Sequence, residues 1–296
     1  MPTITAIILT KDEEIHIERC IKSLKDFCQD IWVVDSFSTD RTIEIAQSMG
    51  AKTIQHEFKN QAQQFNWALG ALDIRSEWIW RVDADEYVEK PLADKALTAL
   101  DKAEGDVNGV YVNKKIIYLG KPLLHGGWYP AQQIKIIRKG FGMSENKPMD
   151  EHLIITSGKT ISVDGDQTDE NLHSLTWWTE KHNKYADREA LNMLAMAYGM
   201  DDQEKEVQPK LFGNGAERKR WLKLKYARMP LYVRPFLNFF VRYVLQLGFL
   251  YGNHRWYVLQ GFWYRYLVDS KIYELKKSLD FDDDKIKNYL RENYLT

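Results

Sequence analysis

The segment Trp78–Glu86 carries the clearest candidate for chemistry in this chain. It reads WIWRVDADE, an apolar run followed at once by two carboxylates, Asp83 and Asp85. Side chains alternate faces along a strand, so we expect both carboxylates to leave the strand end on one side. Paired oxygen ligands suit a divalent cation that carries a diphosphate, which predicts a site for a nucleotide-linked substrate. The alternative is an acidic turn that caps the next helix, because such short motifs also arise by chance.

Two further polar clusters follow apolar runs in the same way. Thr10–Glu14 reads TKDEE, and Asp35–Asp40 reads DSFSTD. Ligands bind beyond the carboxyl ends of the strands in open α/β sheets, so three clusters at one edge indicate a binding site. Turn formation is the alternative explanation for Asp35, and a first-turn helix acid is the alternative for Asp40.

A parallel sheet would bring these clusters together, and the first half of the chain alternates as such a sheet requires. Apolar runs predict buried strands, while apolar stripes at helical spacing and end signals such as Gly50 predict helices. The expected strands are 3–9, 31–34, 51–55 and 78–82, and the expected helices are 13–27, 39–49 and 61–72. Short connections in this order predict an α/β fold with a mostly parallel sheet flanked by helices.

Beyond residue 105 the pattern changes to longer strands, 110–118 and 133–138. The acidic pair Asp150-Glu151 then precedes a short strand at 153–156, and an amphipathic helix is expected at 174–198. We therefore expect a catalytic domain over 1–200 (halves of about 1–105 and 106–200), a polar linker over 201–217 and a helical extension over 218–296.

The extension is basic and aromatic. Residues 218–271 hold eleven Lys and Arg against one acid, Asp269, and fifteen of these 54 residues are Phe, Trp or Tyr. Proline and glycine predict several short helices, with breaks at Pro230, Pro235, Gly248, Gly252 and Gly261. Such a segment fits helices that lie on an anionic membrane surface; the alternative is a subdomain that buries its rings against a neighbour. Arg234 and Arg242 interrupt the most apolar stretch and argue against a bilayer span.

Composition excludes several other classes of protein. The hydrophobic fraction of 44% and charged fraction of 28% are those of an ordinary globular chain, and the net charge is −1. Two cysteines, Cys20 and Cys28, form neither a disulfide framework nor a zinc pattern. No basic leader with a cleavage site is apparent at the start. We expect a cytoplasmic protein, and the site motifs give nucleic-acid binding no support.

Three blocks in order, IILTKDEE, WVVDSFSTDRT and WIWRVDADE, resemble glycosyltransferase family 2, the inverting enzymes of the GT-A fold. The sequences of these blocks are most similar to those of the bacterial glucosyltransferase-like branch that builds lipopolysaccharide cores and surface polysaccharides. The resemblance covers about residues 3–160, and the tail is similar to the tails of some membrane-associated members. It implies transfer of a hexose-type sugar from a nucleoside diphosphate, UDP by default, to a lipid-linked or lipopolysaccharide acceptor at the inner face of the cell membrane.

The resemblance also implies roles for individual residues. Thr10 and Glu13 would contact the nucleoside, Asp35 the base, Asp83 the ribose and the metal side, and Asp85 would bind Mg²⁺ or Mn²⁺ directly.

The catalytic base belongs to an acidic pair in this family, and Asp150 or Glu151 occupies its place here. The order is Asp-Glu instead of Glu-Asp, which leaves the base open. Alignment through the following leucine favours Asp150, whereas alignment of the pair as a unit favours Glu151; we lean toward Asp150.

Phe65 is a second departure, since many members have a basic residue before the equivalent of Asn66. The nucleotide contact of that residue would be absent, or would come from Gln64 or Lys59.

Other residues have two explanations each. His152 and His173 could contact a metal or phosphate, but loop histidines are more often surface or hydrogen-bonded residues. Trp128 and Tyr129 could stack on a sugar or pack in the core. Trp177 and Trp178 are expected in the core.

Two other functions use a similar set of residues. A sugar nucleotidyltransferase also pairs Asp residues with a metal, but it usually has a Gly-rich phosphate loop after its first strand, where this chain reads TKDEE. A non-catalytic sugar- or lipid-binding scaffold is the other alternative. The intact Asp35, Asp83 and Asp85, together with an acid at 150–151, argue against it.

Overall fold

The computed structural model describes residues 1–145, 152–200, 210–212 and 215–294. The chain forms two compact units, Met1–His173 and Ser174–Thr296, and each is described here by itself. The sequence placed the functional division near residue 200 instead. That functional division stays a prediction, because compactness alone does not say which residues serve catalysis.

The first half of the first unit is the predicted β-α repeat. Its elements are β1 (Ile4–Thr10), α1 (Ile17–Leu24), β2 (Asp30–Asp35), α2 (Thr42–Ser48), β3 (Lys52–Gln55), α3 (Gln61–Ala71) and β4 (Trp78–Asp83). The strands lie side by side in the order β3-β2-β1-β4, and all three pairings are parallel. Every residue of β1 is buried, as its unbroken apolar sequence predicts for a central parallel strand.

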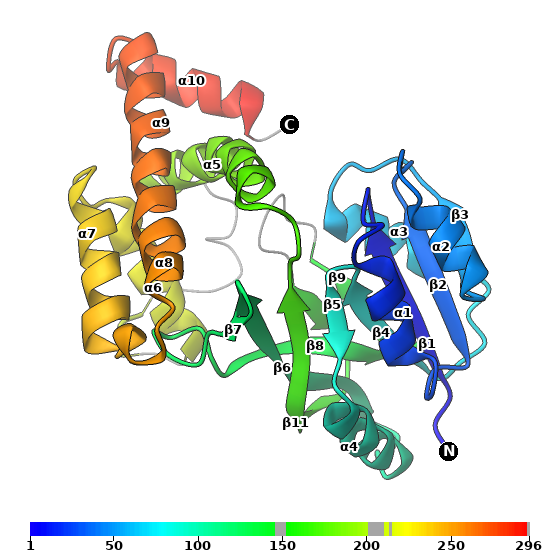
Figure 1. The fold of residues 1–296 in the computed structure, drawn as a ribbon. Helices are drawn as coiled ribbons and strands as arrows, with labels where there is room; N and C mark the ends of the chain where they lie inside the picture. The colour runs from blue at the N-terminus through cyan, green and yellow to red at the C-terminus, as the bar shows by residue number, and fades with distance from the viewer. Residues whose placement is uncertain (146–151, 201–209, 213–214, 295–296) are drawn as a thin grey trace. The chain divides into compact units, whose positions relative to one another are not determined.

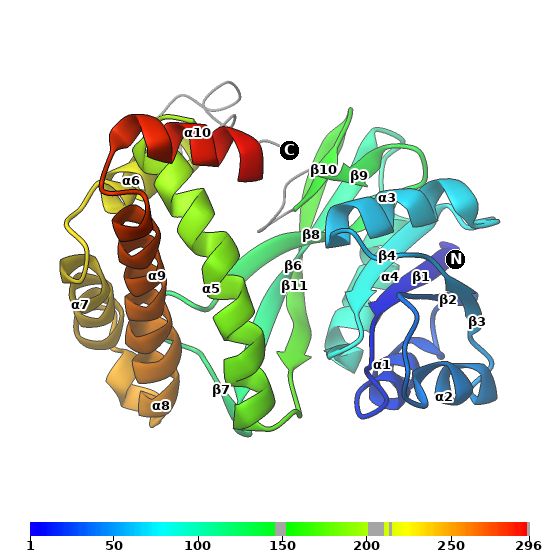
Figure 2. The same ribbon diagram turned by 90° about the horizontal axis from the view of Figure 1, so that it is seen from above.

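Helices cover both faces of this sheet. Figures 1 and 2 show α1 and α2 on one face and α3 on the other. The stripe Ile17, Cys20, Ile21 and Leu24 of α1 is fully buried in a core that also contains Trp78 and Trp80. On the other face, Phe65 and Ala68 of α3 pack with apolar residues of β1 and β4. Each large side chain buried in this way stabilises the fold by roughly 1.5–3 kcal/mol.

The second half of this unit extends the sheet with antiparallel pairings and one parallel pairing. Its elements are β5 (Glu86–Val88), α4 (Lys90–Asp101), β6 (Val107–Tyr118), β7 (Lys121–Pro122), β8 (Ala131–Arg138), β9 (Gly142–Ser144), β10 (Leu153–Ile155) and β11 (Lys159–Glu170). The order beyond β4 is β8-β6-β11-β5, so the sheet is mixed. The parallel pairing is that of β6 with β11, and β9 and β10 form a separate hairpin-like pair. The predicted strands 110–118, 133–138 and 153–156 are confirmed as β6, β8 and β10. Helix α4 and strands β5 and β11 were not predicted from the sequence.

The second unit is helical, as predicted. It contains α5 (Leu175–Ala197), α6 (Gly215–Ala227), α7 (Val233–Phe240), η2 (Val241–Leu245), η3 (Gly248–Tyr251), α8 (His254–Trp256), η4 (Tyr257–Trp263), α9 (Tyr264–Ser278) and α10 (Asp283–Asn293). Its core joins α5, α9 and α10 through residues such as Leu194, Val268 and Ile286. Among the described residues, no helix combines the length and the apolar character that crossing a bilayer would require.

Two of the predicted helix breaks are wrong. Pro235 lies in the first turn of α7, where a backbone N–H has no helical partner to lose, so proline is tolerated there. Gly261 lies inside η4, a π-helical stretch within an uninterrupted helical run from α8 to α9. Pro230, in contrast, falls between α6 and α7 as expected.

Candidate active site

The predicted donor-site residues meet at the carboxyl edge of β1, β2 and β4. Thr10 pairs in register with Asp35 on β2, and Leu9 pairs with Asp83 on β4. Parallel strands that end level with one another therefore bring these polar residues to one edge, as the sequence predicted.

The loops after β1 and β2 hold each other through a set of side-chain bonds. Asp12 accepts a hydrogen bond from the backbone N–H of Thr39 at 2.7 Å, and its own N–H donates to Ser38 Oγ at 2.7 Å. Asp40 accepts from the backbone N–H groups of Thr42 and Glu14 at 2.9 and 3.0 Å. Two acids of the predicted clusters thus serve to shape the edge.

Asp35 lies fully buried within this edge. Its carboxylate accepts bonds from the backbone N–H and the hydroxyl of Ser38, and from the Gln55 amide at 3.0 Å. These contacts are the turn chemistry that the sequence analysis gave as the alternative. The base contact stays a prediction.

Glu13, His16 and His173 bring ligand-type atoms within 4.8 Å of one another. The Leu172 backbone N–H donates to His16 Nε2 at 2.8 Å, so that nitrogen is unprotonated and Nδ1 carries the proton. The Nδ1–H group donates to Glu13 Oε2. Both nitrogens of His16 are therefore in use, and His16 orients Glu13 instead of offering a lone pair to a metal ion.

His173 Nε2 lies 3.8 Å from the same Glu13 oxygen. Two residues earlier, the Asn171 amide lies 3.4 Å from Asp85 Oδ2. The chain leaving β11 therefore carries an imidazole and an amide to the edge where β4 ends.

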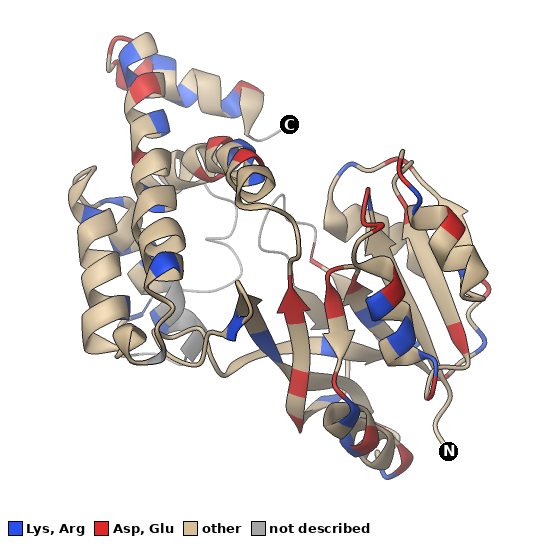
Figure 3. Cartoon of the chain, viewed as in Figure 1, with Lys and Arg blue, Asp and Glu red and all other residues tan. Residues whose placement is uncertain are grey.

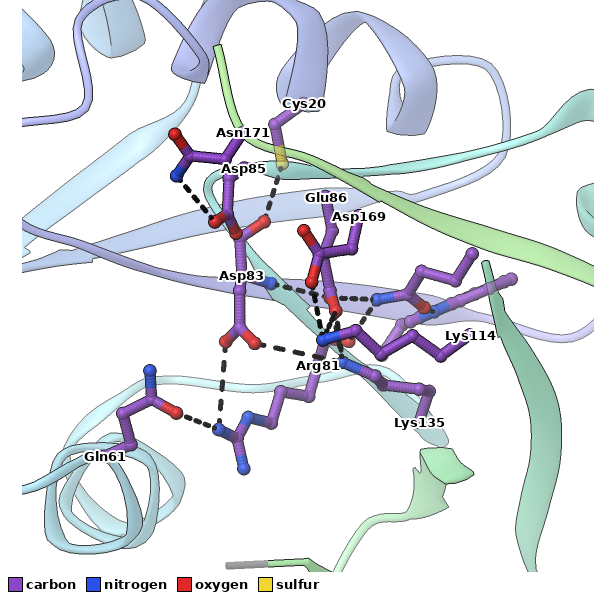
Figure 4. A network of polar contacts seen from close by, with 12 residues as sticks. Cys20, Gln61, Arg81, Asp83, Asp85, Glu86, Lys114, Lys135, Asp169 and Asn171 are labelled. Carbon is purple, nitrogen blue, oxygen red and sulfur yellow. Dashed lines mark hydrogen bonds and ion pairs between the residues drawn. The ribbon is translucent and has the colours of Figure 1, made fainter. Parts of the chain in front are cut away.

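Asp85 differs from its expected position. Strand β4 ends at Asp83, and Asp85 lies in the turn that leads to β5. The alternation of a strand therefore does not extend to it. In Figure 4 the carboxylate of Asp83 points toward Arg81 and Lys135, whereas that of Asp85 points toward Asn171. The measured distances from Asp83 are 3.7 Å to Arg81 and 3.9 Å to Lys135.

A buried ionic network lies behind the two aspartates (Figure 4). Glu86, which is fully buried, accepts bonds of 2.9 and 2.8 Å from Lys135 Nζ and one bond from the Gln167 amide. It also accepts the backbone N–H of Asp83 at 3.1 Å, which fixes the end of β4. Lys114 lies 2.7 Å from Asp169 and 3.6 Å from Glu86. Burial alone would lower the pKa of Lys114, but these two carboxylates hold it above its usual value.

The acids outnumber the bases in this network, and the excess falls on Asp85. Its carboxylate forms no ion pair with a cation among residues 1–145, 152–200, 210–212 and 215–294. Burial, followed by the negative charges of Asp169 and Asp83, raises the pKa of Asp85 to about 8. A carboxyl group in surroundings this negative is well suited to bind a divalent cation, which would supply the missing positive charge.

Lys114, Lys135 and Asp169 were not predicted from the sequence to belong to the site. The signal was present, because Lys135 interrupts the apolar run of β8 and Lys114 lies within β6. Lys135 is 5% exposed, and a buried lysine needs a carboxylate nearby.

Phe65, the departure in α3, is fully buried. The guanidinium of Arg81 lies over its ring, 5.4 Å from the centroid, and 3.7 Å from Asp83. Arg81 thus brings a positive charge close to the position that carries a basic residue in many family members. Gln64 is also buried and bonds to His56 and Ser36, so it serves to join α3 to the β2 and β3 ends.

The remaining predicted residues have varied surroundings. Asp150 and Glu151, the candidates for the base, lie outside the described residues. His152 is exposed. The Tyr129 hydroxyl donates to Asp166 at 3.0 Å. Trp178 is buried as expected, while Trp177 is only half-buried.

Comparison with known proteins finds a family model that matches most of the first unit. Residues 5–142 match the model of the family Glycosyl transferase family 2, so this part of the chain is a family 2 glycosyltransferase domain. It is the part that holds the three strand ends and the Asp83–Asp85 segment.

Proteins of similar sequence are also named glycosyltransferases. An uncharacterized glycosyltransferase of Rickettsia bellii is 40% identical over 92 residues, which are 31% of each chain. The match thus spans about a third of the length of that relative. The lipopolysaccharide core biosynthesis glycosyltransferase LpsC of Rhizobium meliloti is 26% identical over 95% of this chain and 96% of its own.

One solved structure that matches is glucosyl-3-phosphoglycerate synthase of Mycobacterium tuberculosis with Mn²⁺ and UDP. It is 21% identical, covers 38% of this chain and 44% of its own, and has a TM-score of 0.34.

Proposed function

We propose that this protein is an inverting glycosyltransferase that moves a hexose-type sugar from a nucleoside diphosphate, with UDP as the expected carrier, to a lipid-linked or lipopolysaccharide acceptor. One observation carries the proposal: within the family 2 domain, Asp85 is a partly buried carboxyl group with carboxylates around it, and among the residues that the structure describes no cation forms an ion pair with it. A bound Mg²⁺ or Mn²⁺ with a diphosphate would complete this charge distribution.

Asp85 would hold the metal ion directly, with Asp83 on the ribose side. When bound, the ion neutralises negative charge that develops on the departing diphosphate. His173 is a further candidate ligand, because it lies near Glu13 at the same edge. His16 would keep Glu13 oriented toward the nucleoside, and Thr10 and Asp35 would line the nucleoside position.

The reaction would be a single displacement. The acceptor hydroxyl oxygen forms a bond to the anomeric carbon, the bond from that carbon to the diphosphate oxygen breaks, and the hydroxyl proton passes to a carboxylate base. General-base catalysis of this kind contributes about 10²–10⁴-fold. Asp150 or Glu151 is our proposal for the base, with Asp150 favoured. Attack opposite the leaving group inverts the anomeric configuration.

The acceptor class is supported by the relative that aligns over nearly the whole chain and is named for lipopolysaccharide core biosynthesis. Such an acceptor would place the enzyme at the inner face of the cell membrane, and the basic aromatic extension fits that position.

Purified protein should be assayed with UDP-, GDP-, dTDP- and CMP-sugars, with and without Mn²⁺, in the presence of membrane extract. We expect metal-dependent transfer or hydrolysis of one donor, and loss of at least about 100-fold in Asp85→Ala. Asp164→Ala is a matched control, since that β11 carboxylate is 84% exposed and forms a surface ion pair with Lys95. Donor binding that is unaffected by Asp85→Ala would instead identify a non-catalytic scaffold.

A further inference from the structure

Helix α7 and the following η2 turn an apolar face outward. Their exposed apolar side chains recur at spacings of one and three residues, which is one face of a helix. This α7–η2 stripe consists of Phe236, Leu237, Phe240, Val241, Val244 and Leu245, which are 39–64% exposed. Three exposed apolar residues in 247–250 continue it into η3. A contiguous apolar surface of this kind marks an interaction site.

The exposed charges of the segment that carries the stripe have one sign. Asp269, the one acid in residues 218–271, is 1% exposed and bonds to Arg234 Nε at 2.6 Å and to the Tyr232 backbone N–H at 2.7 Å. It is therefore neutralised inside the unit. Figure 3 shows no acidic residue on α7 or α8. Lys225, Arg228 and Arg255 are exposed in this segment.

Cations lie directly beside the stripe. The Tyr243 hydroxyl of η2 lies 2.7 Å from His254 Nδ1, which holds the start of α8, and hence Arg255, against η2. Burial, together with the nearby positive charge of Arg265, lowers the pKa of Arg242. An anion beside Arg242 would relieve the repulsion between the guanidinium groups of Arg242 and Arg265.

We propose that the α7–η2 stripe is a docking surface for an anionic phospholipid bilayer. The rings and aliphatic chains enter the headgroup region, while Arg242 and Arg255 reach lipid phosphates. Each such cation contributes about 1 kcal/mol at an anionic surface. A second copy of the chain fits less well, because a symmetric contact through the stripe would bring like-charged flanks together. This docking does not depend on the transferase reaction.

The test is co-sedimentation of the full chain with vesicles in the absence of any nucleotide sugar. We expect binding to phosphatidylcholine vesicles that contain about one-third phosphatidylglycerol, weaker binding to pure phosphatidylcholine, and loss of the difference at high salt. The double variant Phe240→Ser/Leu245→Ser should lower vesicle affinity at least about tenfold. Phe281→Ser is the matched control, because Phe281 is 51% exposed against 50% for Phe240 and lies in the turn between α9 and α10; it should bind like wild type.

Two more variants keep the test decisive. Leu247→Asn removes an exposed apolar side chain at a residue with φ 58, a conformation that Asn tolerates better than Leu, so the fold should be preserved. It should weaken vesicle binding, and Arg255→Glu should weaken it on anionic vesicles only. Unchanged vesicle binding in the double variant and in Leu247→Asn would overturn the proposal. So would a wild-type dimer that the double variant dissociates, since that result assigns the stripe to a second copy.

Discussion

The raised pKa of Asp85 predicts that this residue lowers the stability of the metal-free protein at neutral and alkaline pH. In the unfolded chain the pKa of this group takes the ordinary value of 3.8, and in the folded protein it is about 8. Between these values the folded state holds a proton that the unfolded state has lost. The free energy of unfolding therefore falls as the pH rises through this interval.

The magnitude follows from the size of the interval. Each pH unit between the two pKa values costs about 1.36 kcal/mol, so the change from pH 5 to pH 8 has a ceiling of about 4 kcal/mol. Part of the Asp85 side chain is accessible to solvent, and solvent screening reduces this pH-dependent change in stability. We expect about 2 kcal/mol. In Asp85→Asn the titration is gone, so the variant should exceed wild type in stability by about 2 kcal/mol more at pH 8 than at pH 5.

Urea unfolding in EDTA, followed by tryptophan fluorescence at several pH values, measures this difference. Asp164→Asn, at an exposed carboxylate, should show no pH-dependent gain. Addition of Mn²⁺ at pH 8 should stabilise wild type and leave Asp85→Asn unchanged, because binding to the folded state alone shifts the equilibrium. A stability difference between Asp85→Asn and wild type that is the same at pH 5 and pH 8 would refute the reasoning about the surroundings of Asp85.

Two further predictions concern neighbouring residues. Glu86→Gln leaves the ammonium of Lys135 buried without its carboxylate, so the free energy of unfolding should fall by about 3–5 kcal/mol in urea titrations. Adding Lys135→Met to Glu86→Gln should recover much of that loss. If the losses of stability of the two single variants simply add in the double variant, the prediction is wrong. His16→Gln should cost about 1–3 kcal/mol by breaking the bonds to Glu13 and the Leu172 N–H. Its Mn²⁺ affinity, measured by calorimetry, should stay within about twofold of wild type; a large loss would make His16 a ligand.

The donor half of the fold was predictable because its two central strands are mostly apolar. β1 and β4 pair on both sides inside the sheet, and their sequences ITAIILT and WIWRVD show it. β11 was not predictable, since its sequence KTISVDGDQTDE is polar and has no strand periodicity. It forms because β6 and β5 supply hydrogen-bond partners on its two edges, which is information that a local window does not contain.

The candidate site shows the same limit. The sequence predicted that Asp35, Asp83 and Asp85 lie at one edge, because the carboxyl ends of neighbouring parallel strands lie at the same edge of a sheet. It did not place the cations that neutralise the neighbouring acids, which come from β6 and β8, about thirty and fifty residues further along. The position of Asp85 was also wrong in detail, because the alternation rule stops where the strand stops and the turn sets the next direction.

Taken together, the ion pairs give the carboxyl edge an unequal distribution of charge. Glu86 and Asp169 have lysine partners within hydrogen-bonding distance, and Asp83 has two cations just beyond it. If these acids served stability alone, an additional lysine or a neutral residue at position 85 would be more favourable. The network instead concentrates its unbalanced charge on the one carboxyl group that lies in the turn beyond β4. An arrangement that is costly without a cation and favourable with one is what a site for a metal-bound diphosphate requires, and the opposite pH trends of the metal-free and metal-bound protein would reveal it.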